Sequence, residues 1–181
     1  MKELSDLCSQ RNLDEVNLTR LHQLIADKQI CIDYQFKASA PIVLLCQDNN
    51  NRHLYRTLEI FLQRDDLDIN ATSPYGFNAL MFLCLLHRHE DLINCVQLLV
   101  NRGINAEAKG KEGENALQLL CQNYDGKNLR DIATILINNS TSLNDISKCV
   151  GILRNRKLYS PSKTISKILQ HIRNGRSHVN N

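Results

Sequence analysis

The chain has 181 residues, 43% of them hydrophobic, and a formal net charge of +3, which suits one domain of ordinary size with a core of its own. Aromatic residues make up only 5% and there is no tryptophan, so we expect packed helices with a core of Leu, Ile, Val and Cys rather than a β-sandwich. No run reaches the ~18 apolar residues of a membrane span, and the N-terminus has no apolar signal region, so we expect neither a transmembrane segment nor secretion.

Leu-Cys pairs divide the first two thirds of the chain into regular intervals of 38, 38 and 37 residues. The pairs end at Cys8, Cys46, Cys84 and Cys121. The segments around the last three align with one another at 40–47, 78–85 and 115–122. An apolar helical run follows each segment, at 57–63, 95–101 and 132–138, and then a short polar connector. This pattern predicts a repeated unit of helix, loop, helix and extended connector, whose apolar faces are buried by stacking.

We predict a single repeat domain over residues 1–175, followed by a flexible tail at 176–181. Its five units cover residues 1–35, 36–73, 74–110, 111–144 and 145–175. Asn78 and Asn115 stand just before their helices, where an Asn side chain can accept a backbone N–H bond. Gly76 and Gly113 precede them by two residues, which suits a turn with positive φ.

The last unit differs from the others in its sequence and its charge. Residues 145–181 carry 8 basic side chains and 1 acidic one, whereas residues 1–144 carry 14 basic and 18 acidic ones. For its final helix we predict Ser160 as the N-cap, Pro161 at the first helical position and Gly175 just after the end. A polar terminal repeat is what a helical stack needs as a cap.

The cysteines and histidines admit a chemical interpretation and a structural one. The seven cysteines include no C-x-x-C pair, and one cysteine per stacked unit places the sulfurs about 8–10 Å apart, too far for a disulfide or a shared zinc ion. We therefore interpret the cysteines as reduced thiols of a cytoplasmic or nuclear protein, and those at the equivalent repeat positions as buried packing residues. His87 and His89 with the adjacent acids are a weak metal or hydrolase signal, and we expect a solvated loop there.

The repeat resembles the ankyrin family. The stretch NATSPYGFNALMFLC (70–84) matches the family pattern N-A-x-D-x-x-G-x-T-P-L-H-L-A-A at Asn70, Ala71, Gly76 and Leu80. The stretch 103–121 matches at Gly103, Ala108, Gly113 and Leu117. The Thr-Pro-Leu-His motif is replaced by Asn-Ala-Leu-Met and Asn-Ala-Leu-Gln, and the units are longer than usual. The resemblance implies an all-α, ankyrin-type helical repeat solenoid of about five repeats with short β-hairpin-like connectors.

The resemblance also implies a function, because connector tips and inner helix faces form the concave binding surface of such proteins. Carried over by position, the partner-binding residues are Tyr75, Phe77, Met81, Lys111, Glu112, Glu114 and Gln118. Three further tip positions are Thr72, Pro74 and Lys109. A weaker resemblance concerns Asn70, which matches asparagines that are hydroxylated in some ankyrin repeats.

We accordingly expect a monomeric scaffold or adaptor that binds a protein partner on its concave face. No G-x-S-x-G elbow or phosphate loop occurs, so we expect no enzyme, no small-molecule substrate and no cofactor. The alternative is electrostatic docking of a nucleic acid or an anionic surface by the basic C-terminal unit. Among the residues near its cations only Tyr159 is aromatic, which disfavours sequence-specific binding of nucleic acid.

Overall fold

The computed structural model describes residues 2–10, 13–33, 39–48, 53–137 and 141–177. These ranges contain ten α-helices and no β-strand, which confirms the predicted all-α class. The helices are α1 (Lys2–Cys8), α2 (Glu15–Ala26), α3 (Pro41–Asp48), α4 (Leu54–Phe61), α5 (Ala79–Leu86), α6 (Leu92–Asn101), α7 (Ala116–Asn123), α8 (Leu129–Leu136), α9 (Leu143–Asn155) and α10 (Tyr159–Ser177).

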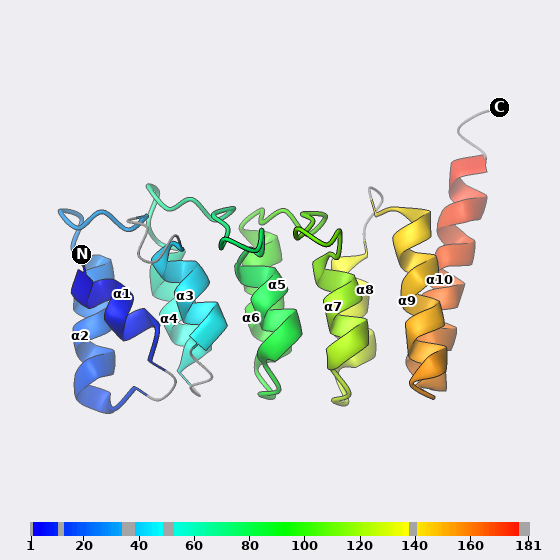
Figure 1. Ribbon diagram of the computed structural model, residues 1–181, viewed down its shortest axis with the longest axis horizontal. Helices are drawn as coiled ribbons and strands as arrows, with labels where there is room; N and C mark the ends of the chain where they lie inside the picture. Colours follow the sequence, from blue (N-terminus) through cyan, green and yellow to red (C-terminus); the bar gives the residue numbers. More distant parts are fainter. Residues whose placement is uncertain (1, 11–12, 34–38, 49–52, 138–140, 178–181) are drawn as a thin grey trace.

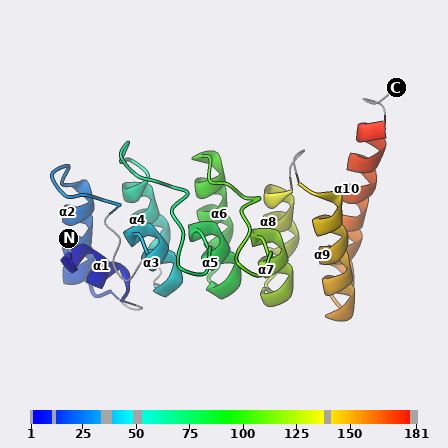
Figure 2. The same cartoon turned by 45° about the horizontal axis from the view of Figure 1, so that its top comes forward.

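Consecutive helices form pairs, and the pairs follow one another in a row along the longest axis of the molecule (Figure 1). The first helices of the pairs pack on each other in the order α1, α3, α5, α7 and α9. The second helices form a parallel series, α2, α4, α6, α8 and α10. Figure 2 shows the two series as separate layers. Each predicted unit thus contains one helix pair, although α9 begins at Leu143, inside the fourth predicted unit.

The core lies between the two layers and between successive pairs. In α5 every residue from Ala79 to Cys84 is buried, so this helix is covered on all sides by its neighbours. In α6 only Leu92, Cys95, Val96 and Leu99 are buried, at the spacing of one helical face. Burying one such aliphatic side chain contributes about 1.5–3 kcal/mol. Stacking is therefore what stabilises helices as short as 8 residues.

The helix starts follow the predicted local chemistry. The Asn78 side chain accepts a hydrogen bond from the Met81 N–H at 3.0 Å. Asn115 does the same with the Gln118 N–H, also at 3.0 Å. Gly76 and Gly113 have φ of 79° and 84°, the left-handed region that the turn prediction requires. Both predictions are confirmed at both units.

The predicted limits of the final helix were wrong. α10 begins at Tyr159 and continues through Gly175 to Ser177. The chain leaves α9 through Lys157, whose φ is +60°, and the next helix starts at once, because the Ser162 N–H donates to the Leu158 carbonyl. Pro161 therefore lies inside the first turn, where its missing N–H costs nothing. Of the predicted tail, residues 176–177 are helical and 178–181 lie outside the described residues.

The two long edges of the stack are built differently (Figure 1). The loops that join the helices of one pair line one edge, and the connectors between pairs line the other. Arg64 illustrates how a connector is fixed: its guanidinium donates to the carbonyls of Ile25, Asp27 and Ile30 at 2.7–2.8 Å and pairs with Asp66 at 2.7 Å. This one buried side chain links the end of α2 to the end of α4.

Candidate functional site

Two connectors end in tight turns, the first turn at residues 73–77 and the second turn at residues 110–114. In each turn the N–H of the first residue donates to the carbonyl of the last, at 2.9 Å and 2.8 Å. The Lys111 N–H also donates to the Tyr75 carbonyl at 3.0 Å, which holds the two turns side by side. The predicted tip residues therefore stand on an ordered backbone.

The two predicted aromatic contacts differ in exposure. Tyr75 is 65% exposed. Phe77 is half-buried, with its ring edge-on to Phe82 at 5.4 Å between centroids. The ring also covers Gly110 so closely that a methyl group there would collide with it. Tyr75 is thus available to a partner, whereas most of the Phe77 ring packs within the fold.

Met81 and Gln118 do not lie as the sequence predicts. Met81 is only 1% exposed, so it offers no area to a partner. Gln118 is 5% exposed, and its side chain accepts from the Asn115 N–H at 3.1 Å and donates to Asp145 at 2.9 Å. Both positions were predicted to face a partner. The close approach of α5, α7 and α9 covers them instead.

Lys109, predicted at a connector tip, forms an ion pair within the fold. Its ammonium pairs with Asp145 at 2.5 Å while about two fifths of its side chain stays exposed. Asp145 itself is buried and also lies 3.9 Å from the Lys148 ammonium. The one acidic residue of the basic C-terminal unit is therefore satisfied internally by groups of three units, since Gln118 also donates to it.

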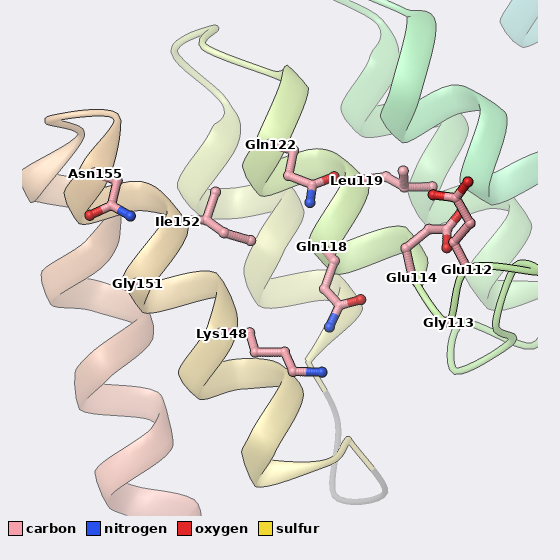
Figure 3. Close-up of a pocket in the computed structure, with 10 residues that line it drawn as sticks. All are labelled: Glu112, Gly113, Glu114, Gln118, Leu119, Gln122, Lys148, Gly151, Ile152 and Asn155. Atoms are coloured by element: carbon pink, nitrogen blue, oxygen red, sulfur yellow. The ribbon is translucent and has the colours of Figure 1, made fainter.

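Of the other predicted tip residues, Glu112 and Glu114 border an open hollow of about 580 Å³ between α7, α9 and the second turn. Glu112 is exposed and Glu114 is half-buried, and the exposed residues Thr72, Pro74 and Lys111 lie outside the lining. The hollow is lined by Glu112, Gly113, Glu114, Gln118, Leu119, Gln122, Lys148, Gly151, Ile152 and Asn155. In Figure 3 the two glutamates stand on the side of the second turn and Lys148 on the side of α9.

Charges across this hollow are not paired with one another. Within the described ranges the structure has no ion pair at Glu112 or Glu114. The Oε2 atom of Glu114 is covered and, within the same ranges, lacks a hydrogen-bond partner. Gln122 and Asn155 are exposed amides on the far side, and Gly151 leaves open space where a side chain would stand.

Besides Gly113, which was predicted only as a turn glycine, six residues of the hollow were missed by the sequence analysis: Leu119, Gln122, Lys148, Gly151, Ile152 and Asn155. Four of them belong to α9, in the unit that least resembles its neighbours, so no alignment could carry a binding position onto it. The signal that was present is Gly151, a glycine in a helix interior, where Ala would be about 0.5–1 kcal/mol better.

The loop at 87–91 was predicted to be solvated, and for His87 this was wrong. The His87 side chain is buried, and its Nε2–H donates to the Cys46 carbonyl at 2.6 Å. Burial lowers the pKa of His87, and its Nδ1 has no hydrogen-bond partner in the described part of the chain. Arg88 reaches in the other direction and donates to the Asn123 carbonyl at 2.7 Å. The loop thus connects α5 to both neighbouring helices.

The basic residues of the C-terminal unit fall into two groups. Arg156 donates to the carbonyls of Cys121 and Tyr124 at 2.7 Å and 2.9 Å, so it closes the end of α7. Lys163 and Lys167 are exposed on α10, one helical turn apart, and Arg154 and Lys157 are exposed near the end of α9. These exposed cations, unlike Arg156, are available for electrostatic docking.

The cysteines are free thiols, and all those of the Leu-Cys pairs are buried, as predicted. Burial raises the pKa of the Cys84 thiol to about 12. Cys149, which lies outside the Leu-Cys pairs, is close to Cys121, and interaction with that thiol together with burial raises the pKa of Cys149. The two side chains enter the same α7–α9 interface, which brings them closer than the helix axes.

Asn70 contributes to the connector backbone. Its Oδ1 accepts from the Asn105 N–H at 2.8 Å, and the Asn105 carbonyl in turn accepts from the Asn78 amide at 3.0 Å. Among the residues described, no group of three or more His, Cys, Asp or Glu side chains is arranged to hold a metal ion. Nor does any helix among them have the length and apolarity to cross a bilayer.

Comparison of the sequence with models of known protein families gives no match. Comparison with curated proteins also gives no significant match. The functional argument for this chain therefore depends on its own geometry.

Proposed function

We propose that this chain is an ankyrin-type repeat protein of five units with short hairpin-like connectors, and that it binds a protein partner on the face formed by the connectors and the first helices. The support is the two-layer stack of helix pairs, together with the glycine turns and asparagine caps at the positions of the family pattern. Repeats of this kind build long surfaces from adjacent units. We place the protein in the cytoplasm or nucleus.

The observation that carries the proposal is the hollow between α7, α9 and the second turn. It is open and about 580 Å³ in volume, and its walls mix carboxylate, ammonium and amide groups with the aliphatic side chains of Leu119 and Ile152. A surface of this kind suits an irregular protein segment, which presents both backbone hydrogen bonds and side chains. Tyr75, on the neighbouring first turn, extends the surface with an exposed aromatic anchor.

The polar groups of this face suit binding better than catalysis. A nucleophile needs a base within hydrogen-bond reach, and the base needs a group that orients it. Here Asp145 is neutralised by Lys109 and bonded to Gln118. We therefore propose a binding module with no catalytic role and no cofactor, monomeric in its free form.

The alternative function, docking of a nucleic acid or an anionic surface, has a narrower basis. Arg156 is used to close α7, and Lys148 lies beside Asp145. Lys163 and Lys167 remain as an exposed pair on α10. A weak, strongly salt-dependent association that is lost in Lys163→Glu/Lys167→Glu and retained when Gln122 and Asn155 of the hollow are replaced by alanine would favour this alternative.

The test uses the immobilised chain and three variants that present the same fold. Tyr75→Ala and Gln122→Ala/Asn155→Ala alter the proposed face, and Glu90→Gln alters an exposed residue on the opposite edge. Proteins retained from a cell extract are identified, purified and measured by calorimetry. We expect a partner bound by the parent and by Glu90→Gln with equal affinity, and at least 10-fold more weakly by the other two.

Unfolding temperatures serve as the control, because exposed substitutions change stability by about 0.5 kcal/mol or less. Phe77→Ala is the contrasting variant: its ring packs on Phe82 and Gly110, so stability falls by about 2 kcal/mol. If every retained protein binds the face variants as tightly as the parent, the concave face is not the binding site and the proposal fails.

A further inference from the structure

The hollow between α7 and α9 also indicates which chemistry its partner presents, an inference that rests on the proposed function. We propose that it receives an extended peptide segment carrying a single Lys or Arg side chain. The cationic group is taken by Glu112 and Glu114, and the peptide backbone lies across α7 and α9. The observations that support this are the charge on each wall, the free amides and a glycine in α9.

The wall formed by the second turn carries the negative charge. Glu112 and Glu114 both border the hollow, and in Figure 3 their carboxylates lie near one another above the turn. Glu112 is exposed, so its carboxylate is accessible to an ammonium or guanidinium group and can accept charged hydrogen bonds from it. Glu114, half-buried beside it, adds a second negative charge to the same wall.

The opposite wall limits the partner to one cation. Lys148 points into the hollow from α9, with 55% of its side chain exposed. Its nearest acid is Asp145 at 3.9 Å, and that carboxylate is already paired with Lys109 at 2.5 Å. A second basic residue in the partner would meet the Lys148 ammonium and be repelled. The arrangement therefore favours one basic residue among neutral ones and disfavours a polybasic run.

The remaining lining suits a peptide backbone. Gln122 and Asn155 are exposed amides, each with two N–H donors and one carbonyl acceptor, the groups that pair with an extended chain. Leu119 and Ile152 provide apolar surface beside them. The Gln118 side chain, by contrast, is hydrogen-bonded to Asn115 and Asp145, so it holds the wall of the hollow and is not free to bind a peptide.

Gly151 leaves space beside α9 for the backbone of a bound peptide. It lies inside the 13-residue helix α9, borders the hollow, and a Cβ there would have nothing within 4 Å besides its chain neighbours and the backbone of its own helix. Internal packing therefore does not require glycine at this position, and helix formation disfavours it. Close approach of another backbone to α9 is the condition that does require it.

The probe is a set of fluorescein-labelled heptapeptide mixtures, random at six positions and fixed at the centre as Lys, Arg, Glu or norleucine. A fifth mixture has three consecutive lysines at the centre. Binding is measured by fluorescence polarisation at ~0.15 M salt. We expect the Lys and Arg mixtures to bind at least 5-fold more tightly than the Glu and norleucine mixtures, and more tightly than the three-lysine mixture.

Variants of the chain test which residues produce the preference for Lys and Arg. Glu112→Gln/Glu114→Gln should remove the preference for Lys and Arg, and Gly151→Leu should block all mixtures by filling the hollow while the unfolding transition is retained. Glu90→Gln is the matched control and should leave binding unchanged. Lys148→Gln should keep the Lys mixture bound and raise the affinity for the three-lysine mixture at least 3-fold.

The inference is overturned if the Glu or norleucine mixture binds as well as the Lys mixture, or if the preference persists in Glu112→Gln/Glu114→Gln. Tightest binding of the three-lysine mixture, unaffected by Gly151→Leu, would also overturn it and would point to non-specific electrostatic attraction. Failure of the proposed function looks different. In that case the partner captured by the whole chain is insensitive to Tyr75→Ala and to Gln122→Ala/Asn155→Ala. A partner lost in those variants but indifferent to the two glutamates would refute this inference alone.

Discussion

The loop edge of the stack and the second turn of the connector edge use their charged side chains in opposite ways. On the loop edge, His87, Arg88 and Arg156 each donate to a carbonyl at or near the C-terminal end of a neighbouring helix. At the second turn, Glu112 and Glu114 border an open hollow and form no ion pair within the described residues.

The difference follows from what a helix leaves unsatisfied at each end. The last four carbonyls of a helix have no partner within it, and in short helices stacked closely together water has little access to them. Side chains from the next unit must therefore satisfy them. At the other end, Asn78 and Asn115 cap the helix starts locally. Glu112 and Glu114, which stand just before the Asn115 cap, form no ion pair within the described residues and are available for binding.

The largest expected effect on the free energy of unfolding is at Arg156, on the loop edge. Arg156→Ala removes two charge-assisted bonds to the carbonyls of Cys121 and Tyr124 and leaves them unsatisfied, so we expect a loss of about 2 kcal/mol in the free energy of unfolding. Arg154→Ala, an exposed cation on the same helix, should cost about 0.5 kcal/mol or less. Urea unfolding of both variants measures the difference. Equal stabilities would show that Arg156 does not hold the end of α7.

A smaller effect on the free energy of unfolding, and one that depends on pH, is expected at His87. Burial lowers its pKa below the ordinary value of 6.5, so below that pH the unfolded chain binds a proton more readily than the folded one. The contribution of His87 is therefore complete above pH 6.5 and decreases as the pH falls from 6.5 toward the lowered pKa. Arg88 and His89 nearby act in the same direction.

The measurement compares the parent with His87→Gln, whose side-chain amide can still donate to the Cys46 carbonyl but does not titrate. Unfolding free energies are recorded between pH 7.5 and pH 5. The parent should lose more stability than the variant over this range, and the difference isolates His87 from other titrating groups such as His22. Parallel curves would mean that His87 is protonated without cost in the fold.

The smallest effect on the free energy of unfolding is expected in the hollow, and there the substitution stabilises the protein. Gly151→Ala should raise the free energy of unfolding by about 0.5–1 kcal/mol, because the new methyl group meets no atom of the protein and the helix gains propensity. Thermal unfolding measures it. A loss of stability instead would mean that α9 needs the glycine for its own packing, and would remove Gly151 from the argument for a binding site.

The sequence by itself determined those features that depend on neighbouring residues. The 37–38 residue period and the apolar spacing predicted the all-α class, which the ten described helices confirm. Asn78 and Gly76 act locally, within a few residues of their partners, so their roles could be derived from spacing alone. Burial of the paired cysteines followed from their place in the apolar runs.

Only the tertiary structure decided the burial and the hydrogen-bond partners of residues whose partners lie in another unit. His87 bonds a carbonyl 41 positions away, and Gln118 bonds Asp145 at a separation of 27. A polar residue near a helix end has the same sequence signature whether it faces solvent or a neighbouring unit. The choice depends on how closely successive pairs pack, and a degenerate repeat does not encode that distance in any one segment. For the same reason the α9 side of the hollow appeared only when α9 was packed against α7.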